Sequence, residues 1–375
     1  METDHTFAVK QIVPAGSQAL AVRSAALVAR GLRDLARDSN WLIKKVFNGH
    51  TAHLAISSNG QVCAISPPER NGTQRVVLYD IERSVPTLAL AAPDERTVSN
   101  SQSQAAFAWS AAGSRIVIAR EEWKPALHFF DLHGKMLLGT FGEFEILPAN
   151  LAWSATGKYL VAAASGRSGT LRLWKAGANE MPFEGSPARE LAAPNSIEPQ
   201  TYNNAEPGDE GAFGGYGRAA FSPDERAVAS VVAIEGDWAD DTIVIADVPS
   251  MQRQIFHQAQ GHITDLAWVA ASQQLVYCSA GQAYRLDVET MTAEALPFGA
   301  EFCVCHPHLP ICLCFSSWLK NSARGRLFIV DLNRLTICDE RPAEGVLDLR
   351  WSIDGSRAYA VTHDGMGYIY EPPLI

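Results

Sequence analysis

Residues 151–175 read LAWSATGKYLVAAASGRSGTLRLWK and contain one copy of a pattern that recurs along most of this chain. The copy opens with a short apolar stretch that ends in an anchor residue, Trp153, followed by Ser154. A turn comes next, and two more apolar stretches follow, the second of which ends at Trp174. Apolar side chains alternate along these stretches with a period of two, which is typical of β-strands.

The same pattern occurs seven times between residue 51 and the end of the sequence. Its anchors, each with the residue that follows, are Ile56-Ser57, Trp109-Ser110, Trp153-Ser154, Phe221-Ser222, Trp268-Val269, Cys305-His306 and Trp351-Ser352. Its third strands end at Tyr79-Asp80, Phe130-Asp131, Trp174-Lys175, Ala246-Asp247, Leu286-Asp287, Val330-Asp331 and Tyr370-Glu371, so six of the seven endings carry a carboxylate. The mean period is about 49 residues, which lies in the range of β-propeller blades.

The repeat predicts an all-β fold, a seven-bladed β-propeller of four-stranded antiparallel blades that covers residues 41–375. One such sheet cannot bury both of its faces, but blades arranged around an axis cover one another. The last copy ends its third strand at Tyr370, and Pro372-Pro373 cannot donate to a further strand. We therefore expect the strand-like segment 41–47 to supply the missing outer strand and to close the ring, because an open ring would expose sheet edges.

Several motifs resemble the WD-repeat β-propeller family. Asn48-Gly49-His50-Thr51 and Gly261-His262-Ile263 are similar to its Gly-His lead-in, and Leu171-Arg172-Leu173-Trp174 is similar to the strand before its Trp-Asp dipeptide. The resemblance covers residues 41–375 and implies a propeller. The seven copies depart from the family pattern, since none has an intact Trp-Asp pair. The looser propellers of bacterial lactonases and peptidases are therefore further comparators.

Residues 1–40 form an N-terminal extension with one predicted helix over about 17–38. Ser17 is a suitable N-cap, and Leu20, Leu27 and Leu35 lie on one apolar stripe of that helix. The helix either packs on the rim of the propeller or docks in the groove of a partner.

Composition excludes several classes of partner and compartment. The net charge of −10 and the lack of Lys/Arg runs argue against a nucleic-acid partner. The longest apolar stretches have the length of strands, short of the ~20 residues that a membrane span needs. The N-terminus lacks the basic and apolar regions of a signal peptide, and an odd number of cysteines, seven, suggests reduced thiols. We therefore expect a cytoplasmic protein.

The longest connections open on one face of the predicted propeller, which we call the loop face. They are 67–73, 121–126, 235–241 and 316–325 between second and third strands, and the insertion 192–217 between the third and fourth copies. Connections of that length inside a compact domain are usually functional or disordered.

Aromatic residues on the loop face are the predicted partner-binding residues. They are Trp123, Trp238 and Trp318 in three of the connections, and Tyr202, Phe213 and Tyr216 in the insertion. Partly exposed aromatics are typical of interface hot spots, although each tryptophan could instead cover its own loop. Neighbouring acids favour a basic or polar partner segment: Glu121, Glu122, Glu235, Asp237, Asp240 and Asp241.

Residues 303–314, CVCHPHLPICLC, invite a zinc interpretation because they hold four thiols and two imidazoles. The register of the repeat instead indicates that these cysteines are core residues. Cys305 aligns with the anchor Trp109 and Cys312 aligns with Ile116, so the cysteines fall where other copies have core residues. Their Cys-x-Cys spacing also differs from the usual ligand spacing. We expect no metal and no cofactor.

The sequence thus predicts a non-catalytic protein–protein interaction scaffold that binds a protein or peptide with its loop face. The alternative is an enzyme or small-ligand propeller of the lactonase kind, which would need several polar side chains converging from different blades. The sequence singles out no such set, since Arg75, Arg167 and Arg324 are scattered and His363 is isolated among the loops. A third possibility is a subunit that its N-terminal helix docks into an assembly.

Overall fold

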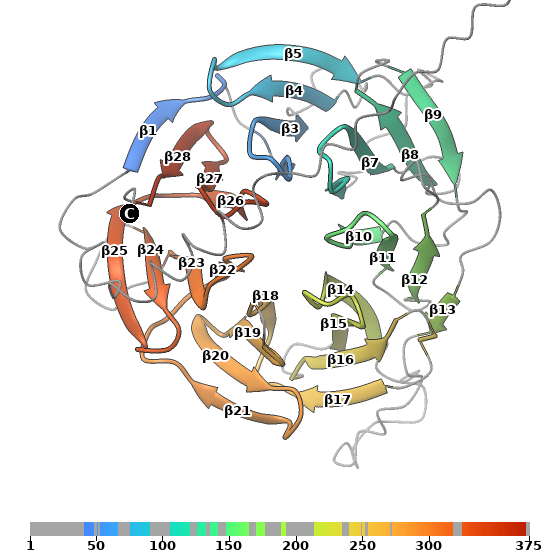
Figure 1. Ribbon diagram of the computed structural model, residues 1–375, viewed down its shortest axis with the longest axis vertical. Helices are drawn as coiled ribbons and strands as arrows, with labels where there is room; N and C mark the ends of the chain where they lie inside the picture. Colours follow the sequence, from blue (N-terminus) through green and yellow to red (C-terminus); the bar gives the residue numbers. More distant parts are fainter. Residues whose placement is uncertain are drawn as a thin grey trace, which may run out of the picture.

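The structure is a computed structural model. It describes residues 41–48, 51, 53–66, 76–90, 106–120, 126–132, 136–141, 148–164, 170–176, 189–192, 214–234, 240–248, 250–251, 254–270, 272–317 and 325–372. The predicted helix over 17–38 lies outside these residues. Within them every regular element is a β-strand, and the strands form seven four-stranded antiparallel sheets arranged around an axis (Figure 1). The seven-bladed β-propeller predicted from the repeat is therefore confirmed.

Each of the first six blades uses four consecutive strands, from the axis outward. The first three blades are β2 (His53–Ile56), β3 (Val62–Ser66), β4 (Val76–Asp80) and β5 (Val85–Leu90); β6 (Phe107–Trp109), β7 (Arg115–Arg120), β8 (Ala126–Asp131) and β9 (Met136–Phe141); and β10 (Pro148–Trp153), β11 (Tyr159–Ala164), β12 (Thr170–Lys175) and β13 (Arg189–Ala192). The next three are β14 (Gly214–Phe221), β15 (Ala227–Ile234), β16 (Thr242–Asp247) and β17 (Gln254–Gln258); β18 (Ile263–Trp268), β19 (Gln274–Ser279), β20 (Gln282–Asp287) and β21 (Thr292–Ala295); and β22 (Phe302–Cys305), β23 (Ile311–Ser316), β24 (Arg326–Asp331) and β25 (Thr336–Pro342).

The seventh blade joins the two ends of the propeller. It consists of β26 (Val346–Trp351), β27 (Ala358–Thr362), β28 (Met366–Tyr370) and β1 (Trp41–Lys45), with β1 on the outer edge beside β28 (Figure 1). The register pairs Trp41 with Tyr370, and the Trp41 indole also donates to Oδ2 of Asp339 in the sixth blade at 3.1 Å. β1 thus covers an edge of β28 that would otherwise be free to pair with another chain.

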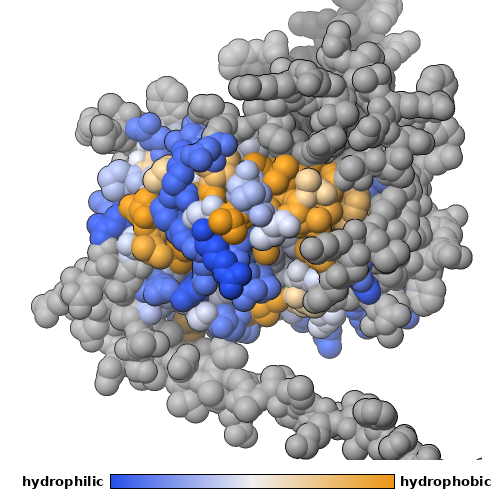
Figure 2. Space-filling view, turned by 90° about the horizontal axis from the view of Figure 1, so that it is seen from above, coloured by the Kyte–Doolittle hydropathy of each residue, from blue (hydrophilic) through white to orange (hydrophobic). Residues whose placement is uncertain are grey.

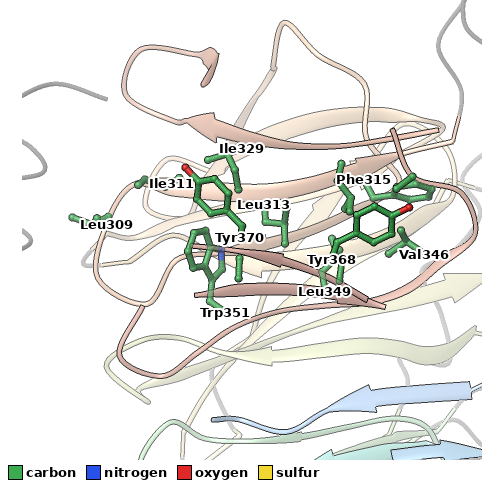
Figure 3. Packing of buried hydrophobic residues seen from close by; sticks show 14 residues of the cluster. Leu309, Ile311, Leu313, Phe315, Ile329, Val346, Leu349, Trp351, Tyr368 and Tyr370 are labelled. Atoms are coloured by element: carbon green, nitrogen blue, oxygen red, sulfur yellow. The ribbon is translucent and has the colours of Figure 1, made fainter. Parts of the chain in front are cut away.

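The described residues form seven hydrophobic core clusters, one at each junction between neighbouring blades. Figure 3 shows the cluster between the sixth and seventh blades, where Trp351 and Tyr370 face Leu313 and Ile329. The Trp351 and Tyr370 rings meet edge to face with centroids 6.4 Å apart. Because each sheet is covered on both faces by its neighbours, both faces of the strands can be apolar.

Three of the four anchor tryptophans also donate a hydrogen bond to the blade before their own. The indole nitrogen donates to a backbone carbonyl at 3.0–3.1 Å in three places: Trp109 to Ala55, Trp268 to Ala220 and Trp351 to Val304. Each acceptor stands one residue before the anchor of the preceding blade. The same buried side chain therefore fills the junction and fixes the position of the adjacent inner strand.

The carboxylates that end the third strands cap the following turns. Oδ1 of Asp80 accepts from the backbone nitrogen of Arg83 at 2.7 Å, and Oδ1 of Asp331 accepts from Asn333 at 2.9 Å. Four residues after such carboxylates the backbone is left-handed at non-glycine positions: Ser84, Met251, Met291 and Leu335, with φ between 54° and 57°. This conformation is costly for residues with a Cβ atom.

Ser84→Gly should therefore stabilise the protein. Glycine adopts a φ of 57° without the steric penalty of a Cβ atom, so the free energy of unfolding should rise by about 0.5–1 kcal/mol. Ser84→Ala is the matched control, because it also removes the hydroxyl but keeps the Cβ atom. Denaturant unfolding checks the expectation, and an equal effect of the two substitutions would contradict the role of the backbone conformation.

Candidate functional site

The predicted partner-binding aromatics lie almost wholly beyond the described residues. Trp123, Trp238, Trp318, Tyr202 and Phe213 fall outside them. The sixth, Tyr216, belongs to β14, where its backbone pairs with Val232. The aromatic loop face therefore remains a prediction.

Two acidic residues expected on the loop face accept hydrogen bonds from the backbone before β18, and one of them is buried. Oδ2 of Asp241, which is 2% exposed, accepts from the backbone nitrogen of Ile263 at 2.7 Å and lies 2.9 Å from Nδ1 of His262. Oδ1 of Asp240 accepts from the backbone nitrogen of Gly261 at 2.7 Å. These bonds hold the Gly-His lead-in before β18, and the burial of Asp241 removes that carboxylate from the predicted acidic set while Asp240 stays exposed.

The structure reveals a set of polar residues on the inner strands that the sequence analysis missed. They stand three residues before the anchor, and we call them the inner polar set: Asn150, Arg218, Asp265 and Asp348. In three of these blades the inner strand shifts register against the second strand just before this position, and in the fourth blade Arg218 lies within the shift between Tyr216 and Ala219. A β-bulge of this kind redirects a side chain, and here a polar residue lies within it or directly after it each time.

Three members of the inner polar set connect their blade to the next one. Each side-chain oxygen accepts a hydrogen bond of 2.9–3.0 Å from a backbone nitrogen: Asn150 from Ala219, Asp265 from Cys303 and Asp348 from Ile56. The last of these bonds joins the seventh blade to the first. Since a buried backbone N–H needs an acceptor, these side chains serve as structural links between blades.

Arg218, the fourth member, belongs to the fourth blade, and its side chain approaches residues of the fifth and sixth blades. Its Nε atom lies 3.7 Å from Oδ1 of Asp265, and its guanidinium carbon lies 5.9 Å from the ring centroid of Phe302. The side chain of Arg218 is 41% exposed, whereas that of Asp265 is 16% exposed. The cation therefore keeps contact with solvent while it partners a carboxylate and an aromatic ring.

Burial raises the pKa of both carboxylates in this set. Loss of solvent raises the pKa of Asp265 from 3.8 to about 7, although the positive charge of Arg218 opposes the rise. Burial also raises the pKa of Asp348, and Arg350 and Arg218 oppose that rise. One arginine thus acts on carboxylates from two blades. Asp265 can exchange a proton near neutral pH, which is the range that acid–base chemistry requires.

The cysteine-rich segment places its thiols in the core. Cys303, Cys312 and Cys314 are buried and Cys305 is half-buried, and all seven cysteines of the chain are free. His306 is buried too, and loss of solvent lowers its pKa to about 4. Among the described residues, no three or more His, Cys, Asp or Glu side chains are placed to hold a metal ion. Nor does any described segment form a helix with the length and apolar character that a membrane crossing requires.

Asp265→Asn should remove a pH dependence of stability. The folded carboxyl, with its pKa raised to about 7, binds more protons than the unfolded one between pH 4 and 7, so its contribution to the free energy of unfolding falls as pH rises through that range. The fall is at most about 4 kcal/mol, at roughly 1.4 kcal/mol per pH unit, and partial exposure reduces it. Asparagine keeps an acceptor for Cys303, as Asn150 does for Ala219.

Denaturant unfolding at several pH values checks this expectation. Stability of the variant relative to the wild type should increase from pH 4 to pH 7. Asp224→Asn is the control of opposite sign, because the Ser222 hydroxyl lowers the pKa of Asp224 and its contribution is lost only as pH falls. Parallel pH profiles for the wild type and Asp265→Asn would show that Asp265 does not titrate differently on folding.

Comparisons with known proteins agree on the fold alone. No protein-family model and no curated protein sequence matches this chain. Among solved structures, a chain of the hydrazine synthase of Kuenenia stuttgartiensis is 12% identical, with a TM-score of 0.63 over 88% of this chain and 97% of that one. U3-55K is 12% identical (TM-score 0.60, 88% and 98%), and a chain of a mitotic checkpoint complex is 14% identical (TM-score 0.58, 88% and 94%). The chain shares the β-propeller fold with proteins of very different sequence.

Proposed function

We propose that this protein is a non-catalytic protein–protein interaction scaffold of the WD-repeat-like kind, which recognises a peptide or loop of a partner with its loop face. The observation that carries the proposal is the use of Asn150, Asp265 and Asp348 as links between blades. Side chains that bond to the backbone of the next blade stabilise the ring. Variable connections on such a rigid frame are the usual place for binding residues.

The expected partner segment is basic or polar. Glu121, Glu122, Glu235 and Asp237 accompany the loop tryptophans, and the chain carries a net charge of −10. Opposite charge would speed association and select the partner, while the aromatic side chains would supply most of the affinity. Seven free thiols without a disulfide support a cytoplasmic location. The similar chain in the mitotic checkpoint complex belongs to an assembly by its title, which supports a role in assembly here.

The test is affinity purification followed by mass spectrometry, with the wild type and a variant that carries Trp123→Ala, Trp238→Ala and Trp318→Ala. The wild type should retain a partner that the triple variant, verified as folded, loses. Phe256→Ala is the matched control, because Phe256 is a 48% exposed aromatic residue on the outer strand β17. Equal recovery of partners by the triple variant would assign the tryptophans to loop packing and reject the loop face.

A small-ligand or enzymatic function is the second candidate, and Arg218 is the observation that favours it. Its charge acts on Asp265 and on Asp348, which come from two other blades. One structural neighbour is an enzyme by its title, a hydrazine synthase. Under this candidate, a small carboxylate or phosphate should raise the Tm of the wild type but not of Arg218→Ala. Equal shifts for the two proteins would exclude Arg218 as a ligand-binding residue.

A further inference from the structure

Five of the seven cysteines gather at the junction of the fifth and sixth blades. We call them the thiol cluster: Cys278 on β19, Cys303 and Cys305 on β22, and Cys312 and Cys314 on β23. The register of β22 and β23 places Cys305 opposite Cys312 and Cys303 opposite Cys314. The repeat therefore brings together thiols from two neighbouring blades.

Sulfur atoms within the cluster are in contact. Sγ of Cys305 lies 3.8 Å from Sγ of Cys312, and Sγ of Cys312 lies 3.6 Å from Sγ of Cys314. A disulfide has a sulfur–sulfur distance of about 2.05 Å, so Cys305 and Cys312 would have to approach by roughly 1.8 Å. Rotation of two side chains can supply a movement of that size.

Backbone geometry favours the pair Cys305 and Cys312 over the other contact. The backbone nitrogen of His306 donates to the carbonyl of Ile311 at 2.8 Å, so the neighbouring pair of Cys305 and Cys312 is a non-hydrogen-bonded pair of the ladder. Cα atoms of such a pair are about 4.5 Å apart, within the range of disulfides. Two positions along one strand, as for Cys312 and Cys314, span about 6.6 Å, near the upper limit.

Access from solvent also differs within the cluster. Cys305 is half-buried, whereas the other four thiols are 0–3% exposed. A small oxidant therefore meets Cys305 first. Burial raises the pKa of Cys312 and that of Cys314, so these two thiols are protonated at neutral pH.

We propose that Cys305 and Cys312 form a peroxide-sensitive modification site, at which the two thiols of one blade convert to a disulfide that a dithiol reductant returns to two thiols. In the first step the Cys305 sulfur takes one oxygen atom from hydrogen peroxide, which gives a sulfenic acid and one water. In the second step the Cys312 sulfur attacks the Cys305 sulfur, the sulfur–oxygen bond breaks, and the leaving hydroxide takes the Cys312 proton as a second water. Two thiols are oxidised, and one peroxide is reduced to two waters.

The test uses the purified full chain with and without hydrogen peroxide. Free thiols are blocked with one alkylating reagent, disulfides are reduced, and the released thiols are labelled with a heavier form of the reagent before mass spectrometry. The heavy label should appear on Cys305 and Cys312 together after peroxide, and dithiothreitol added before blocking should abolish it. Cys338 is the matched internal control, since it is also half-buried but bonds its thiol to the Thr336 carbonyl.

Two substitutions separate the steps. Cys305→Ser should leave Cys312 unlabelled after peroxide. Cys312→Ala should give no disulfide but should accumulate a sulfenic acid on Cys305, which a dimedone probe detects. Heavy label on Cys303 and Cys314, or further oxidation of wild-type Cys305 while Cys312 stays a thiol, would overturn the proposal. The wild-type result decides between these outcomes even if a variant fails to fold.

Discussion

The packing of each blade between its two neighbours is the constraint on which the ring depends. At three of the junctions a buried anchor tryptophan, Trp109, Trp268 or Trp351, also donates its indole N–H to a carbonyl of the preceding inner strand. Loss of such a partner would leave a buried donor unpaired at a cost of about 1–3 kcal/mol. The inner polar set bonds in the other direction, so the blades are held by directional contacts as well as by apolar packing.

The fold could be predicted because the apolar residues that form the core recur at the same places in every copy of the repeat. The anchors recur at a regular interval, and the prolines after Tyr370 pointed to a strand from elsewhere in the chain. The inner polar set was missed because a β-bulge breaks the period of two, and a bulge leaves no mark of its own in a single sequence. A comparison of the position three residues before each anchor would have found Asn150, Arg218, Asp265 and Asp348 together.

At two turns, the position of a residue in the repeat predicts its role better than its residue type does. In the fourth blade Glu225 takes the left-handed position that glycine holds in four other copies, with φ of 58°. In the sixth blade Nδ1 of His306 accepts from the backbone nitrogens of His308 and Leu309, in place of the serine hydroxyl that follows other anchors. Both residues fit the turn through backbone geometry and hydrogen bonding, which their residue types alone did not indicate. The predicted aromatic site depends on long connections, where the repeat provides no register at all.

The pairing of β1 with β28 has a consequence for the way the protein folds. Trp41 and Tyr370 meet across roughly 330 positions of sequence, whereas the strands of every other blade are close neighbours along the chain. The entropy of closing so large a loop must be overcome before the seventh blade gains any contact from its outer strand. The first six blades can form one after another during synthesis, but ring closure must wait until the last strand has left the ribosome. After β28 has emerged, its edge stays open until β1 pairs with it, and this interval is when the chain is most exposed to mispairing.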